Sequence, residues 1–197
     1  MGKSKTTWRL FVALEIPDTV RQYLEGIQAN LRRAGTPVKW VRPEGIHLTL
    51  KFLGDVASHR AEELTRALEK AVTGCAPFQL QPAEVGAFPS VRNPRVIWVG
   101  LEGESAALNG LHKGVERAMR KRGFPGERRP FTPHLTLGRV RRDATRSDLE
   151  ALGRAMVDLD AEVCAPWDVA SLALIRSQLF PDGARYTILS RIPLRGS

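Results

Sequence analysis

Apolar and polar positions recur along the chain with two different periods, and these periods predict helices interleaved with strands. Residues 8–16 form a nearly continuous apolar run, which is typical of a buried strand. Apolar residues then recur at helical spacing from Val20 to Leu31, after Asp18, which suits a helix start. The same reading predicts helices over residues 18–33, 58–73, 104–122 and 145–157. It predicts strands over residues 8–16, 38–41, 46–53, 78–85, 95–101, 133–140, 167–176 and 185–192. The fold class is therefore α+β or α/β, with helices packed on sheets.

The tetrapeptide His-Leu-Thr-Leu occurs twice, at residues 47–50 and 134–137. Each copy follows a turn signal, lies on a predicted strand after a predicted helix, and precedes a glycine and a further helix. Because the flanking pattern repeats together with the tetrapeptide, we interpret the two segments as an internal duplication of a helix–strand–helix unit.

The spacing within each copy assigns its residues to two faces of the strand. Residues i and i+2 share a face, so His47 and Thr49 project on one side and the leucines on the other. His134 and Thr136 follow the same alternation. Duplicated lobes that face each other across a pseudo-twofold axis would bring both His–Thr pairs to one cleft.

Two imidazoles and two hydroxyls in one cleft suit phosphoryl chemistry without a metal. Histidine titrates near neutral pH, so one neutral and one protonated ring can divide the roles of base and acid. Threonine hydroxyls can donate hydrogen bonds to the non-bridging oxygens of a phosphate and stabilise its transition-state charge. We therefore take His47 and His134 as candidate catalytic residues, and Thr49 and Thr136 as candidate substrate-binding residues.

Arg139 is a further candidate for phosphate binding. Strict alternation places it on the face opposite to His134, so we expect a twist or bulge after Gly138 that turns it toward the phosphate. It belongs to the densest basic stretch of the chain, whose other members are Arg117, Arg120, Lys121, Arg122, Arg128, Arg129, Arg141 and Arg142. We interpret this stretch as a contact surface for RNA or phosphate rather than as a solvated helix end.

Composition and charge agree with an intracellular protein that meets an anionic partner. The 197 residues are 43% apolar and 26% charged, which is ordinary for a soluble globular chain. Arginine supplies 23 of the 30 basic residues, and the formal net charge is +9. Cys75 and Cys164 stand far apart in the sequence and form no metal-binding pattern, which suits a reducing compartment. No run approaches the roughly 20 apolar residues of a membrane helix.

Several other residues have simpler explanations than catalysis. His59 and His112 lie on predicted helices without a partner pattern, so we expect them at the surface. The four tryptophans fall on predicted strands and are expected in the core. Phe52 can stack on a base, but the fifth position after His47 alternates to the leucine face, so we expect it in the core. Zinc is the chief chemical alternative for paired histidines, but neither copy has Asp, Glu or Cys at ligand spacing, and we expect no metal and no cofactor.

Extended blocks around both copies resemble the two-histidine phosphoesterase superfamily, and within it the RNA 2',3'-cyclic phosphodiesterase (2'-5' RNA ligase) family. The resemblance covers nearly the whole chain. Its blocks are residues 9–13, residues 40–43 leading into 47–54, residues 132–139, and a closing hairpin with Ser177, Leu179, Gly183, Tyr186 and Leu189.

The resemblance implies an α+β fold of two pseudo-symmetric lobes, each with an antiparallel sheet flanked by helices, around a central cleft. The two lobes would form a single domain over residues 1–197, with residues 1–7 as an extension outside the family pattern. It also implies hydrolysis of RNA 2',3'-cyclic phosphate ends to 2'-phosphomonoesters, without metal or cofactor. Under this assignment His47 protonates the departing 3' oxygen, His134 activates water and Arg139 binds phosphate. Family members also join RNA ends reversibly through a 2'-5' linkage without ATP, and the symmetry of the motifs leaves the acid and base roles interchangeable.

The expected partner is RNA with a 2',3'-cyclic phosphate end, tRNA fragments being one candidate. We expect a monomer in the cytoplasm that does not associate with a membrane. Two alternatives stay open: the same site acting on small cyclic nucleotides or ADP-ribose cyclic phosphate, and a non-catalytic RNA-binding domain. Binding of RNA would weaken steeply with salt, whereas binding of a mononucleotide would not. A matched pair of histidines argues against binding alone, which needs no acid and base.

Overall fold

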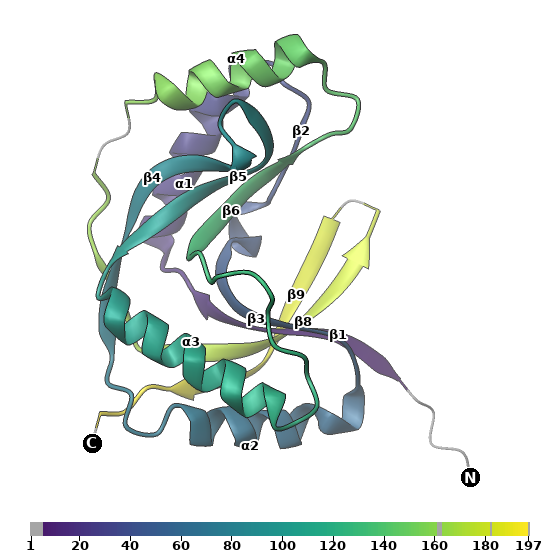
Figure 1. Ribbon diagram of the computed structural model, residues 1–197, viewed down its shortest axis with the longest axis vertical. Coiled ribbons are helices and arrows are strands. Elements are labelled where there is room, and N and C mark those ends of the chain that lie inside the picture. The colour runs from purple at the N-terminus through teal and green to yellow at the C-terminus, as the bar shows by residue number, and fades with distance from the viewer. Residues whose placement is uncertain (1–5, 161–162, 182, 197) are drawn as a thin grey trace.

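The computed structural model describes residues 6–160, 163–181 and 183–196, and its sheet curls with helices at both ends of the molecule (Figure 1). The helices are α1 (Asp18–Arg32), α2 (Ala61–Ala71), α3 (Ser105–Arg120) and α4 (Arg146–Val157), with short 3-10 turns η1 (Pro43–Gly45) and η2 (Ser58–Arg60). The strands are β1 (Thr7–Glu15), β2 (Val38–Trp40), β3 (His47–Ala57), β4 (Phe78–Ser90), β5 (Asn93–Gly103), β6 (His134–Val140), β7 (Trp167–Val169), β8 (Ser171–Phe180) and β9 (Gly183–Pro193).

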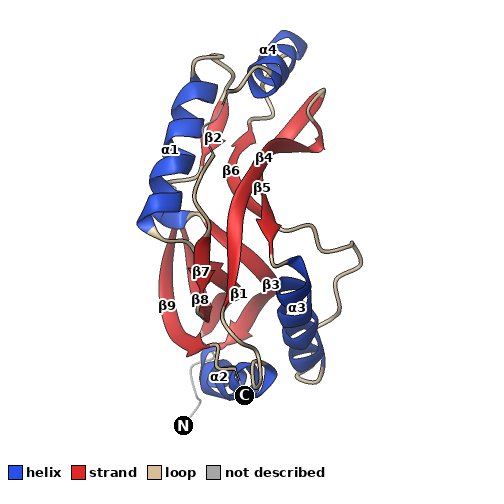
Figure 2. Cartoon of the chain, turned by 90° about the vertical axis from the view of Figure 1, so that its left-hand side faces the viewer, coloured by secondary structure: helices blue, strands red, loops and turns tan. Residues whose placement is uncertain are grey.

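The strands form one antiparallel sheet in the order β7-β4-β5-β6-β3-β1-β8-β9, with β2 paired to the outer part of β6. The sheet divides into two lobes at the middle of this order, because β3 and β6 share a single residue pair, Leu48 with Leu135. Helices α1 and α4 pack beside β2 and β5, whereas α2 and α3 pack beside β3 and β9 (Figures 1 and 2). The predicted bilobal α+β fold is confirmed, and the antiparallel sheets expected for the two lobes are the two halves of one continuous sheet flanked by helices.

The helices form where the apolar spacing predicts them, because each buries one apolar stripe against the sheet. In α1, for example, Val20, Leu24, Ile27 and Leu31 are all buried. α4 begins with a capping box, in which the Thr145 hydroxyl accepts a hydrogen bond from the Asp148 backbone N–H.

Three strand predictions differ from the structure. The strand predicted over residues 46–53 begins at His47 and continues to Ala57. The strand predicted over residues 167–176 is interrupted at Ala170 and continues to Phe180. The segment between the strands predicted over residues 78–85 and 95–101 is mostly strand, because β4 and β5 pair as far as Ser90 with Asn93. The β4–β5 hairpin is therefore longer than the apolar runs alone indicate.

The main hydrophobic core runs through both lobes, and a second, smaller cluster lies apart from it. Leu48, Leu50, Leu135 and Leu137 all belong to the main core, so both motif strands are anchored in the same apolar interior. The smaller cluster comprises Phe11, Ala13, Ala173 and Ile175, with Ile188 packed against it. It forms because β1 buries both faces: Leu10, Val12 and Leu14 enter the main core while Phe11 and Ala13 point the other way.

Thr6 and Thr7, which we expected in an extension over residues 1–7, are part of the folded structure. Thr7 begins β1, and the Thr6 carbonyl accepts a hydrogen bond from the Ser58 backbone N–H at 2.8 Å. The first five residues lie outside the described part of the chain. Among the described residues, no helix is long and apolar enough to cross a membrane.

Candidate active site

The two His-x-Thr segments lie side by side where the lobes meet. β3 begins at His47 and β6 begins at His134, and the antiparallel pair of Leu48 and Leu135 joins the two strands at their second residues. Residues directly opposite each other in an antiparallel pair project from the same face of the sheet. Since the paired leucines are buried in the core, both histidines project from the other face, as the alternation predicts.

We call this surface the histidine face and define it by His47, Thr49, His134 and Thr136. All four side chains are half-buried, whereas the leucines between them are buried. The structure therefore brings together the four residues that the duplicated tetrapeptide singles out.

Both motif strands carry a bulge at the residue after the threonine. In β3 the register against β1 skips Leu50, and in β6 the register against β5 skips Leu137. A bulge inserts one residue and reverses the alternation beyond it. As a result Arg139 is exposed, not placed opposite to His134. The irregularity that we expected after Gly138 thus occurs one residue before it.

The bulge in β3 overturns the prediction for Phe52. Simple alternation places this ring in the core, but Leu50 and Lys51 are both buried and Phe52 is 61% exposed. Its ring centroid lies 6.1 Å from that of Phe11, on the side where Phe11 stacks on His47. Phe52 is therefore an exposed aromatic residue beside the histidine face.

Aromatic rings enclose the imidazole of His47. Phe11 stacks on it with ring centroids 4.6 Å apart, and Tyr186 meets it edge-on at 5.2 Å. Burial among these rings lowers the pKa of His47 to about 4, and a hydrogen bond to the Gly45 backbone opposes the shift. At neutral pH, without a bound anion, the ring is neutral and can accept a proton.

His134 is held by a backbone carbonyl in the same way. Its Nδ1 lies 2.7 Å from the Thr132 carbonyl oxygen, and because a carbonyl only accepts, Nδ1 carries the proton. The other ring nitrogen, Nε2, is left to act on a substrate. Phe88 meets this imidazole edge-on at 5.1 Å, and the Trp98 ring lies 6.3 Å from it.

The positive charge of Arg139 affects the pKa of Tyr186 in the opposite lobe. Burial raises the pKa of Tyr186, and the positive charges of Arg139 and Arg9 oppose that shift. Arg139 lies on β6 and Tyr186 lies on β9, so the arginine charge reaches across the junction of the lobes. Tyr186 in turn contacts His47. The guanidinium therefore influences the region where the two histidines meet.

A pocket of about 110 Å³ opens beside His47. Glu15, Arg21, Glu44 and Tyr186 line it, among others. His134 is not among its lining residues, so this pocket extends from the first histidine only.

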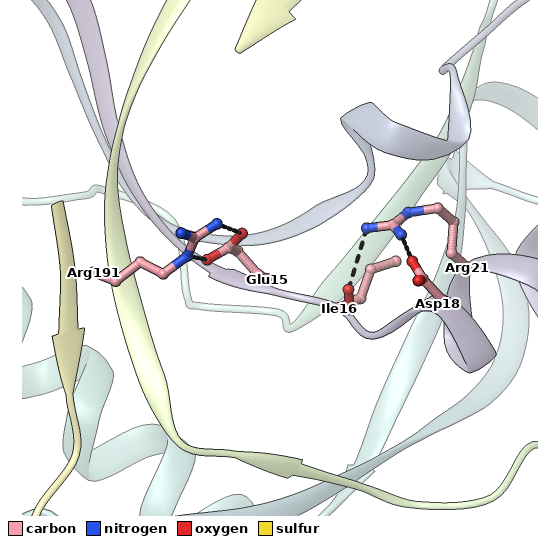
Figure 3. Close-up of polar contacts among 5 residues, drawn as sticks. All are labelled: Glu15, Ile16, Asp18, Arg21 and Arg191. Atoms are coloured by element: carbon pink, nitrogen blue, oxygen red, sulfur yellow. Dashed lines mark hydrogen bonds and ion pairs between the residues drawn. The ribbon is translucent and has the colours of Figure 1, made fainter. Parts of the chain in front are cut away.

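Figure 3 shows how the charged lining of this pocket is held in place. Arg191 donates from Nε to Glu15 Oε2 at 2.7 Å and from an outer nitrogen to Glu15 Oε1 at 3.1 Å. On the other side, Arg21 pairs with Asp18 and donates to the Ile16 carbonyl at 3.3 Å. Because Arg191 engages both oxygens of Glu15, that carboxylate is neutralised and presents little repulsion to a phosphate.

The remaining sequence-based candidates have mixed outcomes. His112 is half-buried rather than exposed, with its ring stacked on Phe131 at 3.9 Å. Trp167 is buried as predicted, but the other three tryptophans are only partly buried. Trp98 lies across Gly86, where a Cβ would come within 2.3 Å of its ring. In the described part of the chain, no three His, Cys, Asp or Glu residues gather as a metal-binding group.

Sequence reasoning missed the aromatic environment of both histidines. Phe11 and Tyr186 come from strands far from His47 in sequence, and Phe88 reaches His134 from β4. The resemblance includes residues 9–13 and Tyr186, but no local pattern links them to the histidines. Only the sheet order, which places β1 between β3 and β8, reveals these contacts.

Comparison with known proteins identifies the duplication independently. The family model described as LigT like phosphoesterase matches this chain twice, over residues 14–98 and 99–186. Each match contains one His-x-Thr motif.

Two curated relatives match over nearly their whole length. A protein of Methanothermobacter thermautotrophicus named RNA 2',3'-cyclic phosphodiesterase is 32% identical over 91% of this chain and 95% of its own. A protein of the same name from Thermus thermophilus is 33% identical over 95% of this chain and 91% of its own.

Solved structures share the fold. The crystal structure of TT0787 of Thermus thermophilus has a TM-score of 0.78 at 30% identity, over 95% of this chain and 98% of that one. E. coli LigT complexed with 3'-AMP has a TM-score of 0.74 at 24% identity, over 96% and 99%. The twofold family match, the relatives and the shared fold agree: the chain belongs to the LigT-like phosphoesterases and is a hydrolase.

Proposed function

We propose that this protein hydrolyses 2',3'-cyclic phosphate ends of RNA to 2'-phosphomonoesters by general acid–base catalysis with His47 and His134. The observation that carries the proposal is their placement on one face of the sheet, each with a ring hydrogen bond to the carbonyl two residues before it. The curated relatives named RNA 2',3'-cyclic phosphodiesterase support the substrate.

The proposed reaction needs one proton taken and one proton given. His134 accepts a proton from water as the water oxygen attacks phosphorus. The bond between phosphorus and the 3' oxygen breaks, and His47 gives its proton to that oxygen. The 2' ester bond remains, so the product is a 2'-phosphomonoester. Acid–base catalysis of this kind typically contributes about 10² to 10⁴-fold for each group.

The acid role of His47 depends on the substrate. Burial keeps this ring neutral in the free protein, with a pKa of about 4. A phosphodiester anion placed beside it favours the protonated ring and raises the pKa. His47 thus becomes a proton donor only when the anion is bound. The low pKa of His47 in the free protein favours the reverse assignment, in which His47 is the base. Titration of both rings with and without phosphate distinguishes the two assignments.

The remaining residues bind and orient the phosphate. Thr49 and Thr136 donate hydroxyl hydrogen bonds to the non-bridging oxygens, and Arg139 stabilises the charge that develops on them. Phe52 offers its exposed ring to the base of the terminal nucleotide. The neighbouring Phe11–His47 stack keeps the imidazole beside this platform.

Three finer features belong to the same proposal. The 5' hydroxyl of a second RNA can take the place of water: its oxygen attacks phosphorus, the bond to the 3' oxygen breaks, and a 2'-5' linkage forms without ATP. RNA substrates such as tRNA fragments, and action as a cytoplasmic monomer, complete the proposal. Both cysteines are unpaired, Cys164 buried and Cys75 half-buried, which suits a reducing compartment.

The direct test is product analysis. A dinucleotide ending in a 2',3'-cyclic phosphate is incubated with the protein in excess EDTA, beside a 2',3'-cyclic mononucleotide. We expect the dinucleotide to yield the 2'-monophosphate alone. A 3'-monophosphate product, or loss of turnover in EDTA, would contradict the mechanism. Turnover of the mononucleotide only would replace the RNA substrate with a small cyclic nucleotide.

A further inference from the structure

A groove of about 640 Å³ lies between α3 and the loop that returns to His134, outside the candidate active site. Figure 2 shows this loop leaving the end of α3 and running back to the middle of the sheet. We call it the α3 groove. It is lined by His112, Lys113, Glu116, Arg117, Arg120, Lys121, Gly126, Glu127 and Arg129.

The accessible charge of the α3 groove is positive. Lys113, Arg117 and Arg120 recur every three or four residues and so share one face of α3. With Lys121 and Arg129 they make five exposed cations. Within the described ranges none of the five forms an ion pair. Such cations keep their full attraction for an anion.

Both carboxylates of the groove pair with one lysine from inside the protein. Lys51 is 2% exposed, and its Nζ lies 2.7 Å from Glu116 Oε1 and 3.6 Å from Glu127 Oε1. The same ammonium donates to the Pro125 carbonyl at 2.6 Å. One buried cation therefore ties α3 and the loop to β3, and offsets one of the groove's two negative charges.

The groove is also preformed by packing between the helix and the loop. At Gly126 an added Cβ would lie 3.5 Å from Arg120 Cδ, so the loop backbone approaches the helix closely there. At the other end, Phe131 stacks on His112 with ring planes only 6° apart. Burial lowers the pKa of His112, so this stack is neutral at physiological pH.

The α3 groove is continuous with the two motif strands. Phe131 stands three residues before His134, and Lys51 stands four residues after His47. Arg129 precedes His134 by five residues, which limits their Cα separation to about 18 Å even for a fully extended chain. A chain of a few nucleotides can span this separation.

We propose that the α3 groove binds the phosphodiester backbone of single-stranded RNA, several nucleotides upstream of the end that reacts. The inference rests on the proposed function, which names RNA as the substrate. The five cations outnumber the two carboxylates. Regularly spaced cations suit a repeating anion, and they contact phosphates without reading sequence. The groove thus favours polynucleotides over mononucleotides.

The test compares two triple variants with the same change of charge. Lys113→Gln, Arg117→Gln and Arg120→Gln remove three groove cations. The control, Arg33→Gln, Lys70→Gln and Arg154→Gln, removes three exposed cations from the region of α1, α2 and α4. Binding of a 3'-hydroxyl dodecanucleotide is measured against salt concentration. Turnover is measured with the cyclic-phosphate dinucleotide, which is too short to reach the groove.

We expect the groove variant to bind the dodecanucleotide about tenfold more weakly than wild type, or weaker still. Its salt slope should fall by about 0.7 for each phosphate that the variant no longer neutralises. Dinucleotide turnover should match wild type, and the control should keep most of the affinity. Equal losses of affinity in groove and control variants would overturn the proposal. A wild-type protein that binds the dodecanucleotide through the groove but hydrolyses no cyclic phosphate would refute the proposed function and leave this inference standing.

Discussion

β3 and β6 share the same local backbone arrangement around their histidines. The histidine opens the strand, a carbonyl two residues earlier holds its ring, and a bulge follows the threonine. The surroundings differ. His47 lies between Phe11 and Tyr186 with its pKa lowered to about 4, whereas His134 lies beside Phe88 and Trp98. The two histidines therefore have similar backbone geometry but different chemical environments.

The residues beyond the two bulges have diverged further. The fourth position after the histidine is buried Lys51 in one copy and Gly138 in the other. A Cβ at Gly138 would lie 2.7 Å from Val38 Cγ1, so β2 occupies the space that a side chain would need. The fifth position is exposed in both copies, as Phe52 and Arg139. One copy thus offers a surface for a base and the other a charge for a phosphate.

The largest expected effect is the loss of either histidine. We expect His47→Ala and His134→Ala each to lower kcat for a cyclic-phosphate dinucleotide by about 10² to 10⁴-fold. Residues that act as one unit are not additive, so the double variant should be little worse than the poorer single variant. Steady-state kinetics on folded variants checks this. A single variant with wild-type kcat would show that its copy has no catalytic role.

The ion pairs of Lys51 distinguish the fourth position of the first copy from Gly138 in the second copy. Lys51→Met leaves Glu116 and Glu127 without their buried cation, which should cost about 3–5 kcal/mol of unfolding free energy. Denaturant unfolding measures this cost. The matched control combines Lys51→Met with Glu116→Gln and Glu127→Gln, and should recover much of the loss. A cost below about 1 kcal/mol for Lys51→Met would mean that the pair behaves as a surface salt bridge.

Acid should destabilise the protein through His47. Its pKa is about 4 when folded, below the ordinary value of 6.5, so the unfolded chain binds the proton first as pH falls. Stability is therefore full above about pH 6.5 and declines toward pH 4, with a loss of about 2.5 kcal/mol by pH 4.5 from this group. The unfolding free energy of wild type and of His47→Gln is measured by denaturant at pH 7 and at pH 4.5. The variant should lack this part of the loss. Equal acid sensitivity in wild type and variant would contradict the buried, neutral ring.

The smallest expected effect concerns the exposed aromatic ring. Phe52→Ala should lower kcat/KM for the dinucleotide by about tenfold, because a stacked base contributes about 1–3 kcal/mol. Phe52→Tyr keeps the ring and should retain most of the activity. Exposed Val157, far along the chain on α4, supplies the control Val157→Ala, which should change nothing. If Phe52→Ala is as active as this control, no base stacks there.

Sequence patterns predicted the elements and the histidine face because both depend on local periodicity. Alternation alone was enough to separate His47 and Thr49 from the buried leucines. It was wrong for Phe52, because a bulge depends on how neighbouring strands pair and leaves no mark in the strand's own sequence. The bulge near Arg139 was predicted only because a phosphate contact was sought for that residue.

The sequence did not predict the electrostatics of the site, because these also depend on how neighbouring elements pack. The lowered pKa of His47 requires burial among aromatic residues from β1 and β9. Lys51 likewise reads as an ordinary strand residue until α3 and its following loop fold over it. These features arise from contacts between elements distant in the chain.

The most direct test of the two-histidine site is an NMR titration of the imidazole rings with and without inorganic phosphate, with His47→Gln and His134→Gln to assign the signals. We predict that His47 titrates near pH 4 in the free protein and that phosphate raises its pKa and moves the resonances of both rings. A shift confined to one ring, or an unchanged His47, would contradict the claim that both histidines face one phosphate.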